Sequence, residues 1–162
     1  VLVNNAAIIS YQKVHEITLD EWNKSIAVNL TGVMLGMREV IPHMKAAGGG
    51  SIINLASAWA LKATDGPAAY HATKAAVRML SRNAAICYAP DKIRVNAMVP
   101  GLVLTPMIAA QAPETAARTA SQIPLGTSTP EEVAAGAVFL ASDDSSAMTA
   151  ADFVIDGGYT AC

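Results

Sequence analysis

Ser51-Ile52-Ile53-Asn54-Leu55-Ala56-Ser57 is a short apolar run, partly β-branched, that follows the three glycines 48–50. This pattern is typical of a strand that is buried on both faces, as the strands of a parallel sheet are. Ser57 would then lie at the carboxyl end of that strand. Because ligands bind at this edge in open α/β sheets, Ser57 is a candidate functional residue.

The segment Tyr70-His71-Ala72-Thr73-Lys74 follows thirteen residues after Ser57 and predicts a reactive tyrosine. Positions i and i+4 of a helix share one face, so the ammonium of Lys74 can approach the phenol of Tyr70. A cation about 5 Å away is expected to lower the pKa of the phenol by about two units, before desolvation offsets part of this shift. The alternative is a helix-surface pair that stabilises the helix by a few tenths of a kcal/mol.

The rest of the chain alternates strand and helix patterns. Strands are expected at 1–3, 93–99 and 153–155, and helices at about 19–47 and 68–89. Two capping-box patterns, at 18–21 and 129–132, mark helix starts. This order predicts the α/β class, with a parallel sheet that helices cover on both faces. Segment 102–126 breaks the alternation and is predicted to be a substrate-binding lid, with an ordinary surface excursion as the alternative.

The composition agrees with one globular domain. The chain has 162 residues, of which 52% are hydrophobic and 15% charged, and its formal net charge is −2. The weak negative charge argues against nucleic acid as a partner. Two cysteines and three histidines at unrelated positions predict neither a disulfide framework nor a metal site. A cytoplasmic protein without a membrane segment is therefore expected.

Seven landmarks in order resemble the short-chain dehydrogenase/reductase family. Besides Ser57, Tyr70 and Lys74, they are Asn4-Asn5-Ala6-Ala7, Asn29 in Val28–Gly32, Pro100-Gly101 after Arg94–Asn96, and Asp156-Gly157-Gly158. The resemblance extends from Val1 to the C-terminal residues. It implies a Rossmann-type doubly wound parallel sheet, of which this chain would form the C-terminal portion with about four strands, the family's strands 4 to 7.

The resemblance also implies an activity. The family transfers a hydride between NAD or NADP and a secondary alcohol or ketone. Tyr70 would be the general acid/base, Lys74 would bind the cofactor ribose and assist Tyr70, and Ser57 would orient the substrate oxygen. Asn29 matches a fourth catalytic position that holds a water, although an asparagine inside a helix could equally serve packing.

Further site residues follow from the same resemblance. Ala7 stands where the family usually has glycine, which a negative φ would tolerate. Ala150 likewise replaces a glycine, at a cost of about 1 kcal/mol if its φ is positive. Residues expected to contact the cofactor are Asn5, Ala6, Tyr70, Lys74, Pro100, Gly101, Val103 and Thr105. Residues expected to contact the substrate are Ser57, Trp59, Tyr70 and Met107, with Leu61, His71 and Ile108 as further pocket candidates.

One family feature has no match in this sequence. A glycine-rich turn between a first strand and helix, which holds the cofactor pyrophosphate, is not found. We therefore interpret the sequence as a partial one, and the alternative function is that of a catalytically silent remnant that only folds or oligomerises. A homo-oligomer, dimer or tetramer, is implied by the resemblance, through the helices at 19–47 and 68–89.

Overall fold

The computed structural model describes residues 1–109 and 113–162, so part of the predicted lid segment lies outside the described residues. Its centre is a four-stranded parallel sheet in the order β1-β2-β3-β4. The strands are β1 (Leu2–Asn4), β2 (Gly50–Leu55), β3 (Ile93–Pro100) and β4 (Asp152–Ile155). The predicted α/β class and the predicted strands are confirmed.

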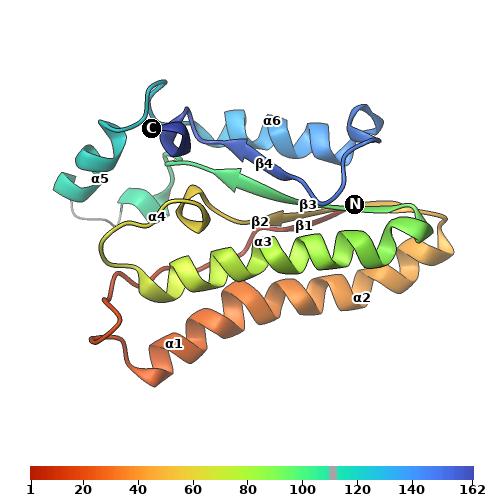
Figure 1. Ribbon diagram of the computed structural model, residues 1–162, viewed down its shortest axis with the longest axis horizontal. Coiled ribbons are helices and arrows are strands. Elements are labelled where there is room, and N and C mark those ends of the chain that lie inside the picture. Colours follow the sequence, from red (N-terminus) through yellow and green to blue (C-terminus); the bar gives the residue numbers. More distant parts are fainter. Residues whose placement is uncertain (110–112) are drawn as a thin grey trace.

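Helices cover both faces of this sheet (Figure 1). On one face lie α1 (Leu19–Ile26), α2 (Gly32–Ala46) and α3 (Ala68–Tyr88), and on the other lies α6 (Pro130–Ala141). The side chains of β2 alternate between two apolar clusters: Ile52 packs with residues of α2 and α3, whereas Ile53 and Leu55 pack with residues of α6. Both faces of β2 are therefore buried, as the apolar run predicted.

The connection from β3 to α6 contains two short helices, α4 (Pro106–Ala109) and α5 (Pro113–Ala120). This connection includes the segment 102–126 that was predicted to be a lid. Leu102 and Ile123, near its two ends, are buried in a third apolar cluster with Ala58 and Tyr159. Both ends of the segment are thus anchored beside the carboxyl ends of β2 and β4.

The helix expected over 19–47 is interrupted. A π-helical turn, Ala27–Thr31, separates α1 from α2. Asn29 lies in this turn, and its side-chain amide accepts a hydrogen bond from the Ile8 nitrogen at 2.8 Å and donates to the Ile8 oxygen at 2.9 Å. Such π-bulges are frequent at functional sites. The helical periodicity of the sequence did not reveal this turn because it inserts only one extra residue into the helical ladder.

The two predicted helix starts differ in their capping. Thr129 and Glu132 form the full capping box of α6, because each side chain bonds the backbone N–H of the other residue. At α1, Thr18 Oγ1 accepts from the Glu21 N–H at 3.3 Å, while the Glu21 carboxylate accepts from the Thr18 hydroxyl instead of its backbone. Both threonines are N-caps, as predicted.

Ala150, two residues before the start of β4, has a φ of +60°. The left-handed region costs a non-glycine residue about 1–2 kcal/mol. The turn is nevertheless held in place, because the Ala150 nitrogen donates to the Val95 oxygen at 2.9 Å and the Ala151 nitrogen donates to Asn96 Oδ1 at 3.1 Å. The strain expected from the sequence is therefore present.

Replacing Ala150 with glycine is expected to stabilise the protein. Relief of the positive φ should raise the free energy of unfolding by about 0.5–1 kcal/mol, after subtraction of the contact that the Ala150 methyl group makes with the core. Urea denaturation followed by circular dichroism measures this difference. The control is Ala151→Gly, at a position without positive φ, which should destabilise. A loss of stability in Ala150→Gly would contradict the strain.

The helices of the described ranges include none that combines the length and the apolar character needed to cross a lipid bilayer. Some large apolar side chains of α3 point outward: Met79 is 63% exposed and Ile86 72% exposed. The neighbouring Cys87 is a free, exposed thiol. The expectation that this helix contacts a second subunit stays a prediction.

Candidate functional site

Ser57 lies two residues beyond the end of β2, at the carboxyl edge of the sheet. It is the N-cap of a short 3-10 helix, Ala58–Ala60, and its hydroxyl accepts a hydrogen bond from the Trp59 N–H at 3.2 Å. The cap fixes the serine side chain at the point where the chain leaves the sheet. This is the position that the apolar run of the sequence predicted.

Helix α3 presents Tyr70 and Lys74 to the same edge. Together with Ser57 they line one cavity of about 660 Å³. Lys74 Nζ donates to the Leu55 carbonyl oxygen at 2.5 Å and lies 5.6 Å from the centroid of the Tyr70 ring. The three groups singled out by their spacing in the sequence are therefore brought together, with the ammonium anchored to the last residue of β2.

The expected lowering of the pKa of Tyr70 is wrong. Burial raises the pKa of Tyr70 above its ordinary value of 10.0; a hydrogen bond with Ser57 opposes this rise, and the nearby Tyr11 adds to it. Burial also lowers the pKa of Lys74 to about 8. Desolvation was expected to offset only part of the shift. It outweighs the shift because both groups leave water when the chain folds, which disfavours both charged forms.

The residues predicted to contact the cofactor line the same cavity. They come from the segment after β1 and from the end of β3 with the loop beyond it, and they are Asn5, Ala6, Pro100, Gly101, Val103 and Thr105. Ala7 also lines the cavity, and its φ is not positive, so an alanine is tolerated there as expected. Sequence reasoning missed the wall formed by α6, namely Pro130, Val133, Ala134 and Ala137. Only the packing of α6 against the sheet could reveal it.

Close packing against Asp156 explains why position 101 holds a glycine. A Cβ atom at this position would lie 2.8 Å from the Cα of Asp156 at the end of β4, which leaves no room for a side chain. The Asp156 carboxylate in turn accepts hydrogen bonds from Gly158 and Thr160. Burial would raise the pKa of Asp156, but these hydrogen bonds outweigh it and lower the pKa.

Ser57 and Tyr70 also line a smaller cavity of about 50 Å³. Trp59, a predicted substrate residue, stands edge-on to the Tyr70 ring, with centroids 6.0 Å apart. Met107 lines both cavities. The remaining walls are mostly apolar: Ile9, Ala58, Gly101, Leu102, Ile108, Thr119 and Tyr159. Substrate carbon atoms beside the two hydroxyls would therefore meet an apolar surface.

Two further pocket candidates lie outside both cavities. His71 stacks behind Trp59 with centroids 5.7 Å apart; its Nε2 accepts from the Thr64 N–H at 3.0 Å, and its Nδ1 lies 2.8 Å from the Pro67 oxygen. It therefore supports the tryptophan from behind. Leu61 is 42% exposed and lines neither cavity.

Asn29 is fully buried and lines neither cavity. In addition to its two bonds to Ile8, its amide nitrogen donates to Thr73 Oγ1 at 3.2 Å. These contacts connect the π-helical turn with α3, one residue before Lys74. They support the packing role of this asparagine, and its predicted role in holding a water stays a prediction.

Comparison with known proteins agrees with this geometry. A family model described as enoyl-(acyl carrier protein) reductase matches residues 1–160. The crystal structure of a putative short-chain dehydrogenase/reductase from Burkholderia xenovorans superposes with a TM-score of 0.94 at 32% identity, over 99% of this chain and 63% of that one. The chain belongs to the short-chain dehydrogenase/reductase family. The resemblance inferred from the sequence is thereby confirmed.

Two curated relatives of this short-chain dehydrogenase/reductase chain carry specific names. A 2,5-dichloro-2,5-cyclohexadiene-1,4-diol dehydrogenase of Sphingobium indicum is 42% identical over 98% of this chain and 64% of its own length. A 3-alpha-(or 20-beta)-hydroxysteroid dehydrogenase of Mycobacterium tuberculosis is 48% identical over 99% of this chain and 60% of its own length. The chain therefore spans less than two thirds of each of these relatives.

A third comparison concerns a structure with a bound nucleotide. The gluconate 5-dehydrogenase from Burkholderia cenocepacia, in complex with NADP and tartrate, superposes with a TM-score of 0.95 at 33% identity. The superposition covers 99% of this chain and 64% of that one. The parallel sheet, its helices and the edge that carries Ser57 thus belong to a fold shared along nearly the whole described chain.

Proposed function

We propose that this short-chain dehydrogenase/reductase chain forms the catalytic part of an oxidoreductase that interconverts a secondary alcohol and a ketone with NAD or NADP. The observation that carries the proposal is that Ser57, which is buried, and Tyr70, which is partly buried, line the same two cavities. Two hydroxyls that converge on one point can hold one substrate oxygen and exchange a proton with it.

The protonation of Tyr70 fits this role. Because burial raises its pKa, the phenol is protonated at neutral pH and can donate its proton to the oxygen of a ketone during reduction. In the reverse direction the deprotonated form of Tyr70, the phenolate left after loss of its proton to solvent, accepts the proton of the alcohol. Ser57 holds the substrate oxygen beside the phenol. The Lys74 ammonium, with a pKa of about 8, is mostly charged at neutral pH and stabilises negative charge that develops on the phenol oxygen.

The residues around the large cavity fit the nicotinamide and ribose part of a dinucleotide. An ammonium carries three N–H donors and the Leu55 carbonyl takes one, so Lys74 can donate to ribose hydroxyls. Asn5, Ala6 and the Pro100–Thr105 segment would hold the same part of the cofactor. When bound, the nicotinamide supplies or accepts the hydride. The solved relative that contains NADP supports this assignment.

For the substrate we propose an alcohol carried on an apolar ring. The small cavity beside Ser57 and Tyr70 has apolar walls that include Trp59 and Ile108. Apolar surface buried there contributes about 25 cal/mol per Å² to binding. Both curated relatives are named for alcohols on rings, a cyclohexadienediol and a hydroxysteroid. Asn29 is in this proposal a positioning residue that holds the start of α3.

Titration of the chain with NADH and NADPH, followed by cofactor fluorescence, tests the first part of the proposal. Binding in the micromolar range is expected, and turnover of cyclohexanol is expected to exceed that of 2-hexanol, which has the same number of carbon atoms. Absorbance of the reduced nicotinamide measures turnover. If neither dinucleotide binds and neither alcohol reacts, the chain is the silent remnant of the alternative interpretation. Equal rates with both alcohols would contradict the ring preference alone.

A further inference from the structure

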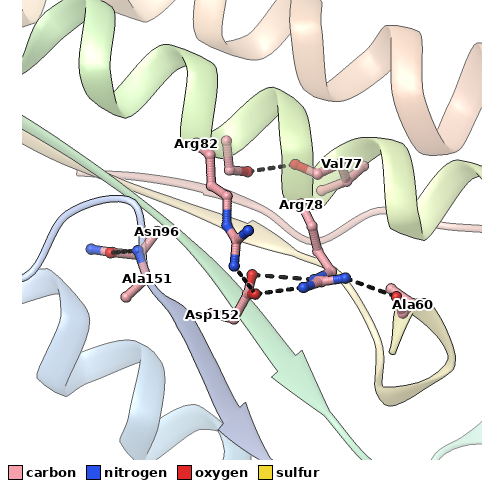
Figure 2. A network of polar contacts seen from close by, with 8 residues as sticks. Ala60, Val77, Arg78, Arg82, Asn96, Ala151 and Asp152 are labelled. Atoms are coloured by element: carbon pink, nitrogen blue, oxygen red, sulfur yellow. Dashed lines mark hydrogen bonds and ion pairs between the residues drawn. The ribbon is translucent and has the colours of Figure 1, made fainter. Parts of the chain in front are cut away.

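Four residues of α3 follow one another at helical i, i+4 spacing: Tyr70, Lys74, Arg78 and Arg82. Neighbours at this spacing lie on adjoining turns of the same side of a helix. The first two line the large cavity, whereas the two arginines both reach the carboxylate of Asp152, the first residue of β4 (Figure 2). A network of charged side chains therefore lies next to Tyr70 and Lys74 on the same side of α3.

Within this network, Arg78 makes the more specific contact with Asp152. Its Nε donates to Oδ1 at 3.2 Å and its Nη2 donates to Oδ2 at 2.6 Å, which is the bidentate geometry of a guanidinium on a carboxylate. Arg82 adds one bond from Nη2 to Oδ2 at 2.5 Å. The side chains of Arg78 and Asp152 are 20% and 13% exposed, against 43% for Arg82. The Arg78 pair is therefore better shielded from water.

Arg78 also makes a third contact, in a different direction. Its Nη1 donates to the carbonyl oxygen of Ala60 at 2.9 Å, as Figure 2 shows. Ala60 closes the 3-10 helix that Ser57 caps and that carries Trp59. One guanidinium therefore joins the turn with Ser57 and Trp59 to the helix with Tyr70 and Lys74.

We propose that Arg78 is a positioning residue of the site, with Asp152 orienting its guanidinium so that an N–H of Nη1 holds the Ala60 carbonyl. The inference rests on the proposed function, because the bond from Arg78 to Ala60 sets the distance between the Ser57 turn and Tyr70. The planar fork of arginine supplies donors along two edges at once, which the ammonium of a lysine cannot do in the same fixed geometry. Arg82 reaches Asp152 but supplies no such bond to Ala60 within the described residues, so the two arginines have different roles.

Trp59 gives a readout that does not depend on activity. The chain has two tryptophans, so a Trp22→Phe background leaves Trp59 as the only one. In this background, Arg78→Met is expected to change the near-ultraviolet circular dichroism of Trp59 and to increase acrylamide quenching of its fluorescence by roughly two-fold, because the turn loses its anchor. Arg82→Met is the matched control, since it removes an arginine from the same carboxylate without touching Ala60.

Kinetics supply the second readout. Arg78→Met is expected to lower kcat for the alcohol by about 10- to 100-fold, with the KM of the dinucleotide nearly unchanged, because a small misplacement of Ser57 acts on the chemical step. Arg82→Met should change kcat less than about three-fold, as expected of a surface charge. Arg78→Lys keeps the charge, and it should leave kcat as low as in Arg78→Met.

The outcomes separate the two proposals. If Trp59 responds as expected but the parent chain turns over no alcohol, the proposed function fails and the positioning of the turn by Arg78 stands. If folded Arg78→Met leaves both Trp59 signals and kcat unchanged, the inference is overturned. Should Arg78→Met fail to fold, Arg78→Lys decides in its place: unchanged Trp59 signals in that variant would overturn the inference as well.

Discussion

Tyr70→Phe is expected to lower kcat for alcohol oxidation by about 10²- to 10⁴-fold, the range that a positioned proton donor contributes. The substitution removes only the hydroxyl. The phenyl ring keeps its place in the cavity wall and its edge-on contact with Trp59, so the affinity for NADH should change less than about three-fold. Initial rates and a fluorescence titration of the same preparation measure the two quantities.

The matched control for this substitution is Tyr88→Phe. Tyr88 is the last residue of α3, and its ring lies under the ammonium of Lys45, outside both cavities. Loss of its hydroxyl should leave turnover unchanged. Turnover of Tyr70→Phe within three-fold of the parent would be incompatible with Tyr70 as the proton-transferring group. If both variants turn over the alcohol at the rate of the parent, Tyr70 does not transfer the proton, and the proposed reaction with Ser57 and Tyr70 is wrong.

Substitution of Lys74 by methionine is expected to alter how stability depends on pH. Burial lowers the pKa of Lys74 from 10.5 to about 8. Between these two values the unfolded chain binds more protons than the folded protein, so the free energy of unfolding of the parent rises with pH. The contribution amounts to at most about 3 kcal/mol over this window, and Lys74→Met lacks it.

The difference between the two proteins therefore has a defined sign. Below pH 8 the ammonium is charged in both states, and its burial costs the folded parent stability; as the pH rises through 10.5 this cost disappears. Relative to Lys74→Met, the parent should become steadily more stable from pH 8 upward. Urea denaturation at several pH values measures this trend.

Lys24→Met, on the exposed side of α1, controls for the loss of a lysine. A difference between the parent and Lys74→Met that stays constant from pH 8 to 10 would contradict the burial of a charged group.

Most of the fold could be predicted because its signals are local. The apolar run before Ser57 is buried on both faces in the structure, and α3 begins and ends within one residue of its predicted bounds. The family resemblance marked Ala150 as a possible strained position, and its φ is indeed positive. The interruption of the first long helix was not predicted, because the amide of Asn29 bonds to Ile8, which is 21 positions away in the chain.

The residues of the candidate site could be predicted from the sequence, but the direction of their pKa shifts could not. Helical spacing alone places Tyr70 and Lys74 on one face, and the strand pattern alone places Ser57 at the carboxyl edge. The sign of the pKa shift of Tyr70 required the folded protein, because desolvation depends on atoms that distant segments bring around the phenol. The i, i+4 series did contain Arg78, yet no sequence signal joined it to Ala60.

Local geometry and long-range packing thus contribute different information. The order and spacing of residues were enough to state the α/β class, the family and the serine, tyrosine and lysine of the site, since each of these depends on near neighbours in the chain. Tertiary structure alone decided that Lys74 bonds to the Leu55 carbonyl, that α6 walls the cavity and that Arg78 anchors the Ser57 turn. Solvation and hydrogen-bond partners are set by groups far apart in sequence, which meet only when the sheet and helices pack.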